Sequence, residues 1–206
     1  MTRDGGWKWA PVILLACTAV LASACSSGSS SASGSSAPAV ASGSVTCNEV
    51  TGGLAFSPPL TVTGTSPETG TIRLHASGCT TSGSSAATVG SGTAAVTLTS
   101  PTSTCSGVLT LRSVALTIHW TPSTIAPSTL TFSGYSITTK PAGNGGFSFP
   151  DPGGTAKVTG SFAGTDAGAS STAAIYFDPS VAQLEAVCRS SGLPSIPVTS
   201  GTVTLK

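Results

Sequence analysis

The chain has few charged and few aromatic residues. Charged side chains make up 7% of the 206 residues and aromatic side chains 5%, and the eight basic residues nearly balance the seven acidic ones. Binding of nucleic acid depends on clustered Lys and Arg that neutralise phosphates, and the basic residues here are scattered. We therefore expect no nucleic-acid partner, and no electrostatic steering of a charged ligand.

The motifs of common catalytic families are also missing. The sequence contains no G-x-S-x-G elbow, Walker loop, H-E-x-x-H, EF-hand loop or S-x-x-K. His75 and His119 are the two histidines, and each alternates with apolar residues, as on the solvent face of a strand. No Cys and His residues cluster at metal-ligand spacing. We therefore predict no catalytic residues, no metal ligands and no cofactor.

No hydrophobic run is long enough to cross a bilayer. The longest, Val12 to Ala24, is shorter than the roughly 20 apolar residues that a membrane helix needs. It follows a short segment with a net positive charge and ends in the small residues Ala22-Ser23-Ala24, which is the layout of a secretory signal. We expect residues 1–24 to be a signal peptide, cut just before Cys25.

The end of this run resembles the lipobox of bacterial lipoproteins. Ala24 and Ser23 match the small residues before the lipobox cysteine, and Leu21 lies one place earlier than the usual leucine. The resemblance implies that Cys25 carries a diacylglyceryl group and anchors the protein to the cell membrane. An ordinary signal peptidase, cutting at the same bond, would instead produce a secreted protein. Cys17 precedes the cut, so five of the six cysteines remain, and lipidation of Cys25 leaves an even number to pair.

Composition divides the remainder into two parts. Residues 26–44 are nearly all Ser, Gly and Ala, and they offer no apolar surface to offset the entropy cost of ordering. We expect 25–44 to be the lipidated cysteine and a flexible linker. Residues 45–206 have the length of one domain.

Short alternating segments in 45–206 predict an all-β domain. In 71–76, for example, Ile72, Leu74 and Ala76 face one way, while Arg73 and His75 face the other. The other segments of this kind are 93–99, 108–111, 114–120, 130–132, 147–149, 156–162, 173–177 and 203–205, and prolines such as Pro58 and Pro59 fall between them. We predict an antiparallel β-sandwich or barrel of about 8–10 short strands.

One segment near the C-terminus predicts a helix, at about 179–190. Asp178 is a suitable N-cap residue, and Gly192 a suitable stop. Leu184 and Cys188 lie on one stripe, so the helix is expected to pack on the sheet with this cysteine inward.

The four cysteines of the domain allow three pairings. We favour Cys79–Cys105, which would close a loop around the 93–99 strand, and Cys47–Cys188, which would tie the start of the domain to its helix.

Aromatic residues are the remaining candidates for a binding site. Trp120 shares a strand face with Ile118, which indicates a core position. Phe147 and Phe149 lie in a glycine-rich stretch, where they would form either an exposed binding loop or a short core strand. His75 and His119 are further candidates for binding.

These observations favour a lipid-anchored extracytoplasmic envelope protein with a binding or structural role. Its expected partners are the membrane, and either a cell-wall glycan or an envelope protein. The alternatives are a wall-directed hydrolase assembled from distant residues such as His75, His119 and Asp166, or an accessory subunit of an envelope complex. The folded part also resembles the Thr-, Ser- and Gly-rich exported domains of actinobacteria, through segments such as 158–164, and this resemblance implies no activity.

Overall fold

The structure is a computed structural model that describes residues 36–64, 68–83, 87–100, 104–105, 113–133, 136–139, 145–150, 155–164 and 171–206. The elements in chain order are β1 (Ser44–Leu60), β2 (Glu68–Ser82), β3 (Ser91–Ser100), β4 (Ser113–Thr121), β5 (Ser128–Ser133), β6 (Ser136–Thr139), β7 (Gly145–Phe149), β8 (Thr155–Gly160), β9 (Thr172–Phe177), α2 (Val181–Ser190), β10 (Leu193–Val198) and β11 (Ser200–Leu205). The predicted segment 108–111 lies outside the described residues.

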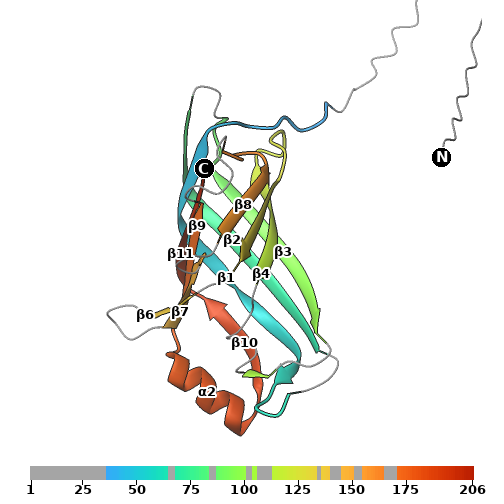
Figure 1. Cartoon of the computed structure of the whole chain (residues 1–206), viewed down its shortest axis with the longest axis vertical. Coiled ribbons are helices and arrows are strands. Elements are labelled where there is room, and N and C mark those ends of the chain that lie inside the picture. The colour runs from blue at the N-terminus through green and yellow to red at the C-terminus, as the bar shows by residue number, and fades with distance from the viewer. Residues whose placement is uncertain are drawn as a thin grey trace, which may run out of the picture. The chain divides into compact units, whose positions relative to one another are not determined.

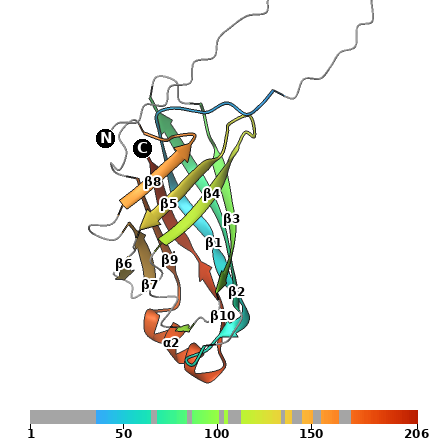
Figure 2. The same cartoon turned by 45° about the vertical axis from the view of Figure 1, so that its right-hand side comes forward.

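The strands form one antiparallel sheet in the order β6-β7-β9-β11-β1-β2-β3-β4-β5-β8. The long strand β1 pairs with β2 along one side, while its other side pairs first with β11 and then with β10. The sheet curls into a nearly closed barrel (Figures 1 and 2). Near the two ends of the sheet, the rings of Phe132 on β5 and Phe149 on β7 meet at a centroid distance of 5.4 Å. The all-β antiparallel prediction is confirmed, and of its two forms the structure adopts the barrel.

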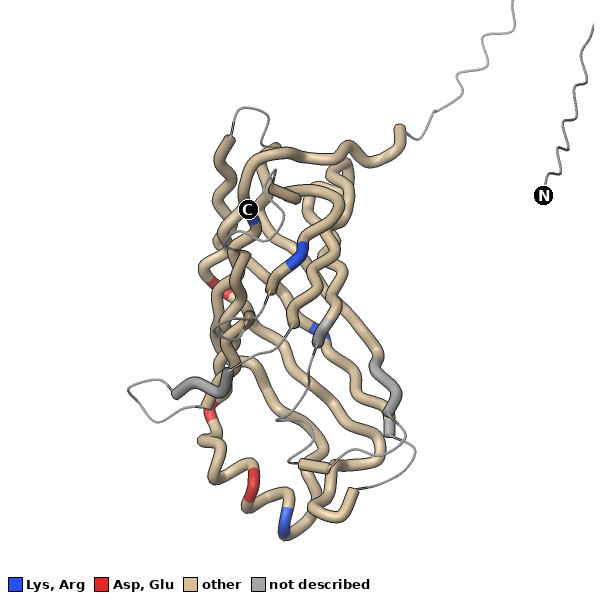
Figure 3. The backbone as a smooth tube through the Cα atoms, in the orientation of Figure 1, with Lys and Arg blue, Asp and Glu red and all other residues tan. Residues whose placement is uncertain are grey.

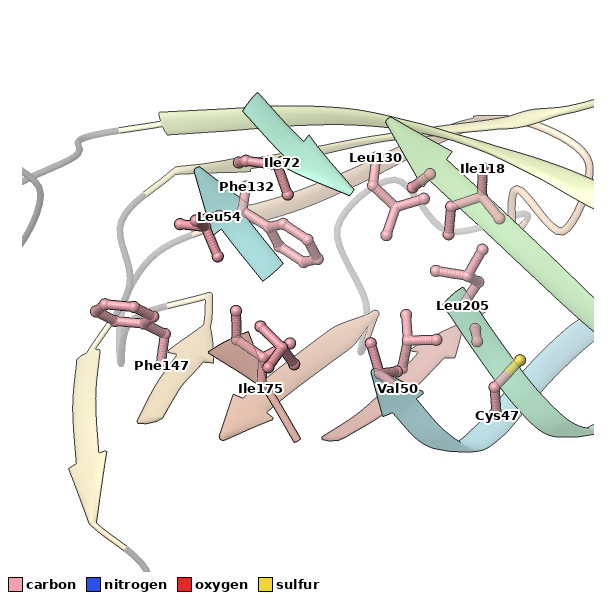
Figure 4. Close-up of a cluster of buried hydrophobic side chains, with 14 of the residues drawn as sticks. Cys47, Val50, Leu54, Ile72, Ile118, Leu130, Phe132, Phe147, Ile175 and Leu205 are labelled. Carbon is pink, nitrogen blue, oxygen red and sulfur yellow. The ribbon is translucent and has the colours of Figure 1, made fainter. Parts of the chain in front are cut away.

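The core lies inside this barrel (Figure 4). Residues that alternate inward on the strands are buried, including Ile72 and Ala76 on β2, and Ile118 and Trp120 on β4. Arg73 and His75, between the inward residues of β2, are exposed. The period-2 pattern therefore identified the inner face correctly for these strands.

The prediction that Pro58 and Pro59 separate strands is wrong. Both lie in the last part of β1, whose pairing with β10 shifts register between Ala55 and Leu60. A proline cannot donate to a ladder hydrogen bond, and an irregular stretch of strand tolerates this loss. The strand therefore continues through both prolines to Leu60, which is fully buried.

The predicted helix is present, but its cap is one that the sequence analysis did not choose. Ser180, not Asp178, is the N-cap: its hydroxyl accepts from the Gln183 backbone N–H, and the Gln183 side chain accepts from the Ser180 N–H. The Pro179 carbonyl is engaged outside the helix, where it accepts from the N–H of Gly145 on β7. Leu184 and Cys188 are buried, as predicted.

The domain begins earlier than the predicted boundary at residue 45. We call residues 36–43 the N-terminal strap. The Ala39 N–H donates to the Thr124 carbonyl (2.8 Å), and the Ala39 carbonyl accepts from the Ala126 N–H (2.8 Å). Ala41 is buried, and its carbonyl accepts from the Phe162 N–H (2.7 Å). Backbone hydrogen bonds, to which composition gives no clue, hold these small residues on the barrel.

Buried serines hold the strap against the core. The Ser161 hydroxyl accepts from the Ala41 N–H (3.0 Å), and Ser161 is fully buried. Its carbonyl accepts from the Ser128 hydroxyl, which in turn accepts from the indole N–H of Trp120 (2.8 Å). This chain of hydrogen bonds satisfies polar groups whose burial would otherwise be costly.

Both predicted disulfides are wrong. The bridges are Cys47–Cys79 and Cys105–Cys188. Cys47 on β1 lies directly opposite Cys79 on β2 in the strand register, so the pairing of these two long strands brings the sulfurs together. The predicted pairing was based on the loops that each bridge would close, whereas strand register determines which cysteines are adjacent.

Candidate binding site

The predicted lipidation site, Cys25, lies outside the described residues. No helix within the described ranges has the length and hydropathy to cross a membrane.

The two histidines lie on the outer face of the barrel, in one row. His75 on β2 and His119 on β4 are both directly opposite Thr93, which lies on the strand between them. Their backbones are therefore two strand spacings, or about 10 Å, apart. Both side chains are exposed, so the structure places them on an open surface.

Of the three residues suggested for a hydrolase, the structure describes His75 and His119, and it brings neither of them to a described carboxylate. Asp166 lies outside the described residues. Among the residues that are described, neither histidine has a hydrogen bond or ion pair to a carboxylate, and the ion pair found there joins Arg189 to Glu185 on α2 (3.1 Å). The same part of the chain has no group of three or more His, Cys, Asp or Glu residues that could hold a metal ion.

Phe147 and Phe149 lie on β7, and their rings contact other aromatic rings. Phe147 is 4% exposed and meets Phe177 at a centroid distance of 5.5 Å. Phe149 is half-buried and lies against Phe132. Of the two interpretations considered above, the placement is that of a core strand, and the aromatic surface is used in packing.

Charges are sparse over the part of the barrel that the structure describes (Figure 3). Arg73 on β2 and Lys157 on β8 are exposed single charges, and α2 carries the Glu185–Arg189 pair. The described surface therefore offers no concentrated field for a charged partner.

The barrel interior contains an apolar cavity. Its volume is about 40 Å³, and its wall is built from strands on several sides of the barrel. The lining residues are Val50, Leu74, Ala76, Gly92, Ala94, Leu116, Ile118, Leu130, Phe132, Ala173, Ile175, Thr202 and Val203. Figure 4 shows Val50, Ile118, Leu130, Phe132 and Ile175 converging inside the barrel.

Comparison of this chain with protein-family models, curated proteins and solved structures found no match. The role of the candidate site must therefore be inferred from its geometry alone.

Part of the signal for this cavity is present in the sequence, but the signal is incomplete. Ala76, Ala94 and Ala173 occupy inward positions where most strands carry larger residues. Small inward residues leave space only if they face one another across a closed sheet. That arrangement depends on strand order, which alternation alone does not give.

Proposed function

We propose that the protein is a lipid-anchored domain on the outer side of the cell membrane, with a binding or structural role. The observation that carries the proposal is the cysteine pairing. Two disulfides use all four cysteines of the folded domain, which leaves Cys25 as the odd thiol after the expected cut. An odd thiol in an exported protein requires an explanation, and a thioether to a diacylglyceryl group provides one.

The disulfides also support the compartment. Two disulfides in a β domain fit an oxidising, extracytoplasmic environment, because cytosolic thiols are kept reduced. Two or more acyl chains, at about 0.8 kcal/mol per buried CH₂, would give stable anchoring to the membrane.

The chain enters the barrel at the end opposite α2. The N-terminal strap leads into Ser44, at the start of β1, whereas Gly192, just after α2, lies against Pro59 and Leu60 at the end of β1. The strap and α2 therefore lie at opposite ends of the barrel (Figure 1). With an anchor at Cys25, residues 26–35 could extend to about 35 Å at most. An anchor at Cys25 would thus be joined to the strap end of the barrel, and the α2 end would be available to a cell-wall glycan or an envelope protein.

The test compares two cysteine variants in the native host. We expect the wild-type protein and Cys17→Ala to partition into the detergent phase on phase separation, and Cys25→Ala to enter the aqueous phase. Intact mass should show acyl groups on the wild-type N-terminus. Cys17→Ala is the matched control, because it removes the other thiol of the apolar run and leaves the lipobox unchanged.

Two results would overturn the proposal. One is a Cys25→Ala protein that still partitions into detergent. The other is a wild-type mass that corresponds to an unmodified Cys25 thiol.

A further inference from the structure

The cavity inside the barrel is lined by carbon. In the described part of the chain, thirteen residues line it: twelve are apolar or glycine, and Thr202 alone has a polar side chain. None of these thirteen residues is ionisable. One water molecule needs roughly 10–15 Å³ on the same measure, and it also needs polar partners, which this wall does not supply. An apolar wall of this kind favours an apolar guest over water.

Small residues on opposite walls create the space. Ala94 lies on β3, and Ala173 lies on β9, which is on the other side of the sheet order. Gly92 is different, because a Cβ there would come within 2.7 Å of Cγ2 of Ile118 and within 2.8 Å of the Trp120 ring, so these two side chains already fill its space. The alanines therefore determine the free volume.

Among the described residues, the pairing of β3 with β4 ends beside the cavity. β3 and β4 are paired only from Ser91 to Ala94 on the β3 side, whereas β3 stays paired with β2 as far as Ser100. β4 likewise stays paired with β5 down to Ser113. Beyond Ala94, the two strands diverge (Figures 1 and 2).

Inward residues next to this divergence are accessible to solvent. Leu74 and Leu116 line the cavity but are only half-buried, and Val96 on β3 is half-buried as well. Leu130, directly opposite Leu116 on β5, is 2% exposed. Apolar surface on the inner side of the sheet is therefore partly exposed where β3 and β4 diverge, and it is buried farther from that point.

We infer that the barrel interior binds the hydrocarbon chain of a small amphiphile, which enters between β3 and β4. The end of the chain occupies the cavity between Ala94 and Ala173, and the following carbons lie against Leu74 and Leu116. No charged residue is among the described residues that line the cavity, so the polar head remains in solvent and a neutral head suffices. This inference goes beyond the proposed anchoring role and does not depend on lipidation of Cys25.

The test uses the full chain with Cys25→Ala, exported through its own signal, so that no covalent acyl chain competes. The probe is a monoacylglycerol with a dodecanoyl chain, below its critical micelle concentration, measured by calorimetry. We expect saturable binding of one molecule per protein. Ala94→Leu, which fills the cavity, should weaken binding at least tenfold. Ala95→Leu is the matched control, because the neighbouring side chain points outward and is exposed.

A second measurement locates the ligand without any substitution in the barrel. Methyl resonances of Ile118 and Ile175, which line the cavity, should shift on titration with the probe. Those of Ile125 and Ile196, which are buried elsewhere, should remain unchanged. If Ala94→Leu fails to fold, these shifts decide the question alone. Absence of saturable binding, shifts only outside the cavity, or equal affinity in a folded Ala94→Leu protein would each overturn the inference.

Discussion

Removal of the Cys105–Cys188 disulfide should strongly destabilise the barrel. The bridge closes a chain separation of 83 residues, for which loop-closure entropy predicts about 4–5 kcal/mol. It also holds Cys188, 3% exposed on α2, close to the end of β1, where the Cys105 N–H donates to the Thr61 carbonyl (3.2 Å). Since domains are stable by about 5–15 kcal/mol, Cys105→Ala/Cys188→Ala should lose a large share of the total.

The assay is urea denaturation without reductant, in the Cys25→Ala background. Trp120, the one tryptophan after the expected cut, is 3% exposed and reports unfolding by its fluorescence. The midpoint should fall, and the dependence on urea should steepen, because the unfolded chain without the bridge exposes more surface. The matched variant Cys47→Ala/Cys79→Ala, with a chain separation of 32 residues, should lose slightly less, about 3–4 kcal/mol.

Thiol counts in the denatured variants test the pairing directly. Cys105→Ala/Cys188→Ala and Cys47→Ala/Cys79→Ala should contain no free thiol, because each removes a whole bridge. Cys47→Ala/Cys188→Ala, which removes one partner from each bridge, should release both remaining thiols or force them into a new pair with lost stability. The reasoning is refuted if Cys47→Ala/Cys188→Ala contains no free thiol and is as stable as the two variants that each lack one complete bridge. It is also refuted if Cys105→Ala/Cys188→Ala loses less than about 1 kcal/mol, well below the usual range.

Two further substitutions test the interior. Ser128→Ala leaves the buried indole N–H of Trp120 without its acceptor, so the free energy of unfolding, measured by urea denaturation, should fall by about 1–3 kcal/mol. Ser133→Ala, on the exposed face of the same strand, should lower it by less than about 1 kcal/mol. Equal losses would argue against the buried network. Gly92→Ala places a Cβ within 2.7 Å of Cγ2 of Ile118 and within 2.8 Å of the Trp120 ring, and it should lower the free energy of unfolding by about 1–3 kcal/mol. Gly90→Ala, with open space around it, should be close to neutral, and a neutral Gly92→Ala would show that the two side chains can move aside.

Alternation predicted strands well because it reports a local property. In a strand between core and solvent, every second side chain faces the core. Ile72 and Ile118 could therefore be placed inward without knowledge of the fold. The helix was found for a similar reason, since the spacing of Leu184 and Cys188 defines a stripe on its own. The N-cap was missed because Asp178 and Ser180 are both good caps.

The errors concern contacts between distant parts of the chain. The Cys47–Cys79 bridge follows from the register of β1 on β2, which no local pattern specifies. Ala39 and Ala41 have the composition of a linker, but backbone hydrogen bonds to Thr124 and Phe162 make them part of the fold. The cavity depends in the same way on which strands face one another across the barrel.

The strap has a mechanical consequence for a tethered domain. A pull on the tether first reaches the backbone hydrogen bonds of Ala39 and Ala41, which tie the strap to Thr124, Ala126 and Phe162. Ala39 pairs with Ile125 as parallel strands do, so its hydrogen bonds run across the chain and tension along the strap loads them in shear. Bonds loaded in shear share the force, whereas bonds opened from one end break in turn. If Cys25 carries the proposed anchor, the strap would take up the force of the tether before it reaches β1.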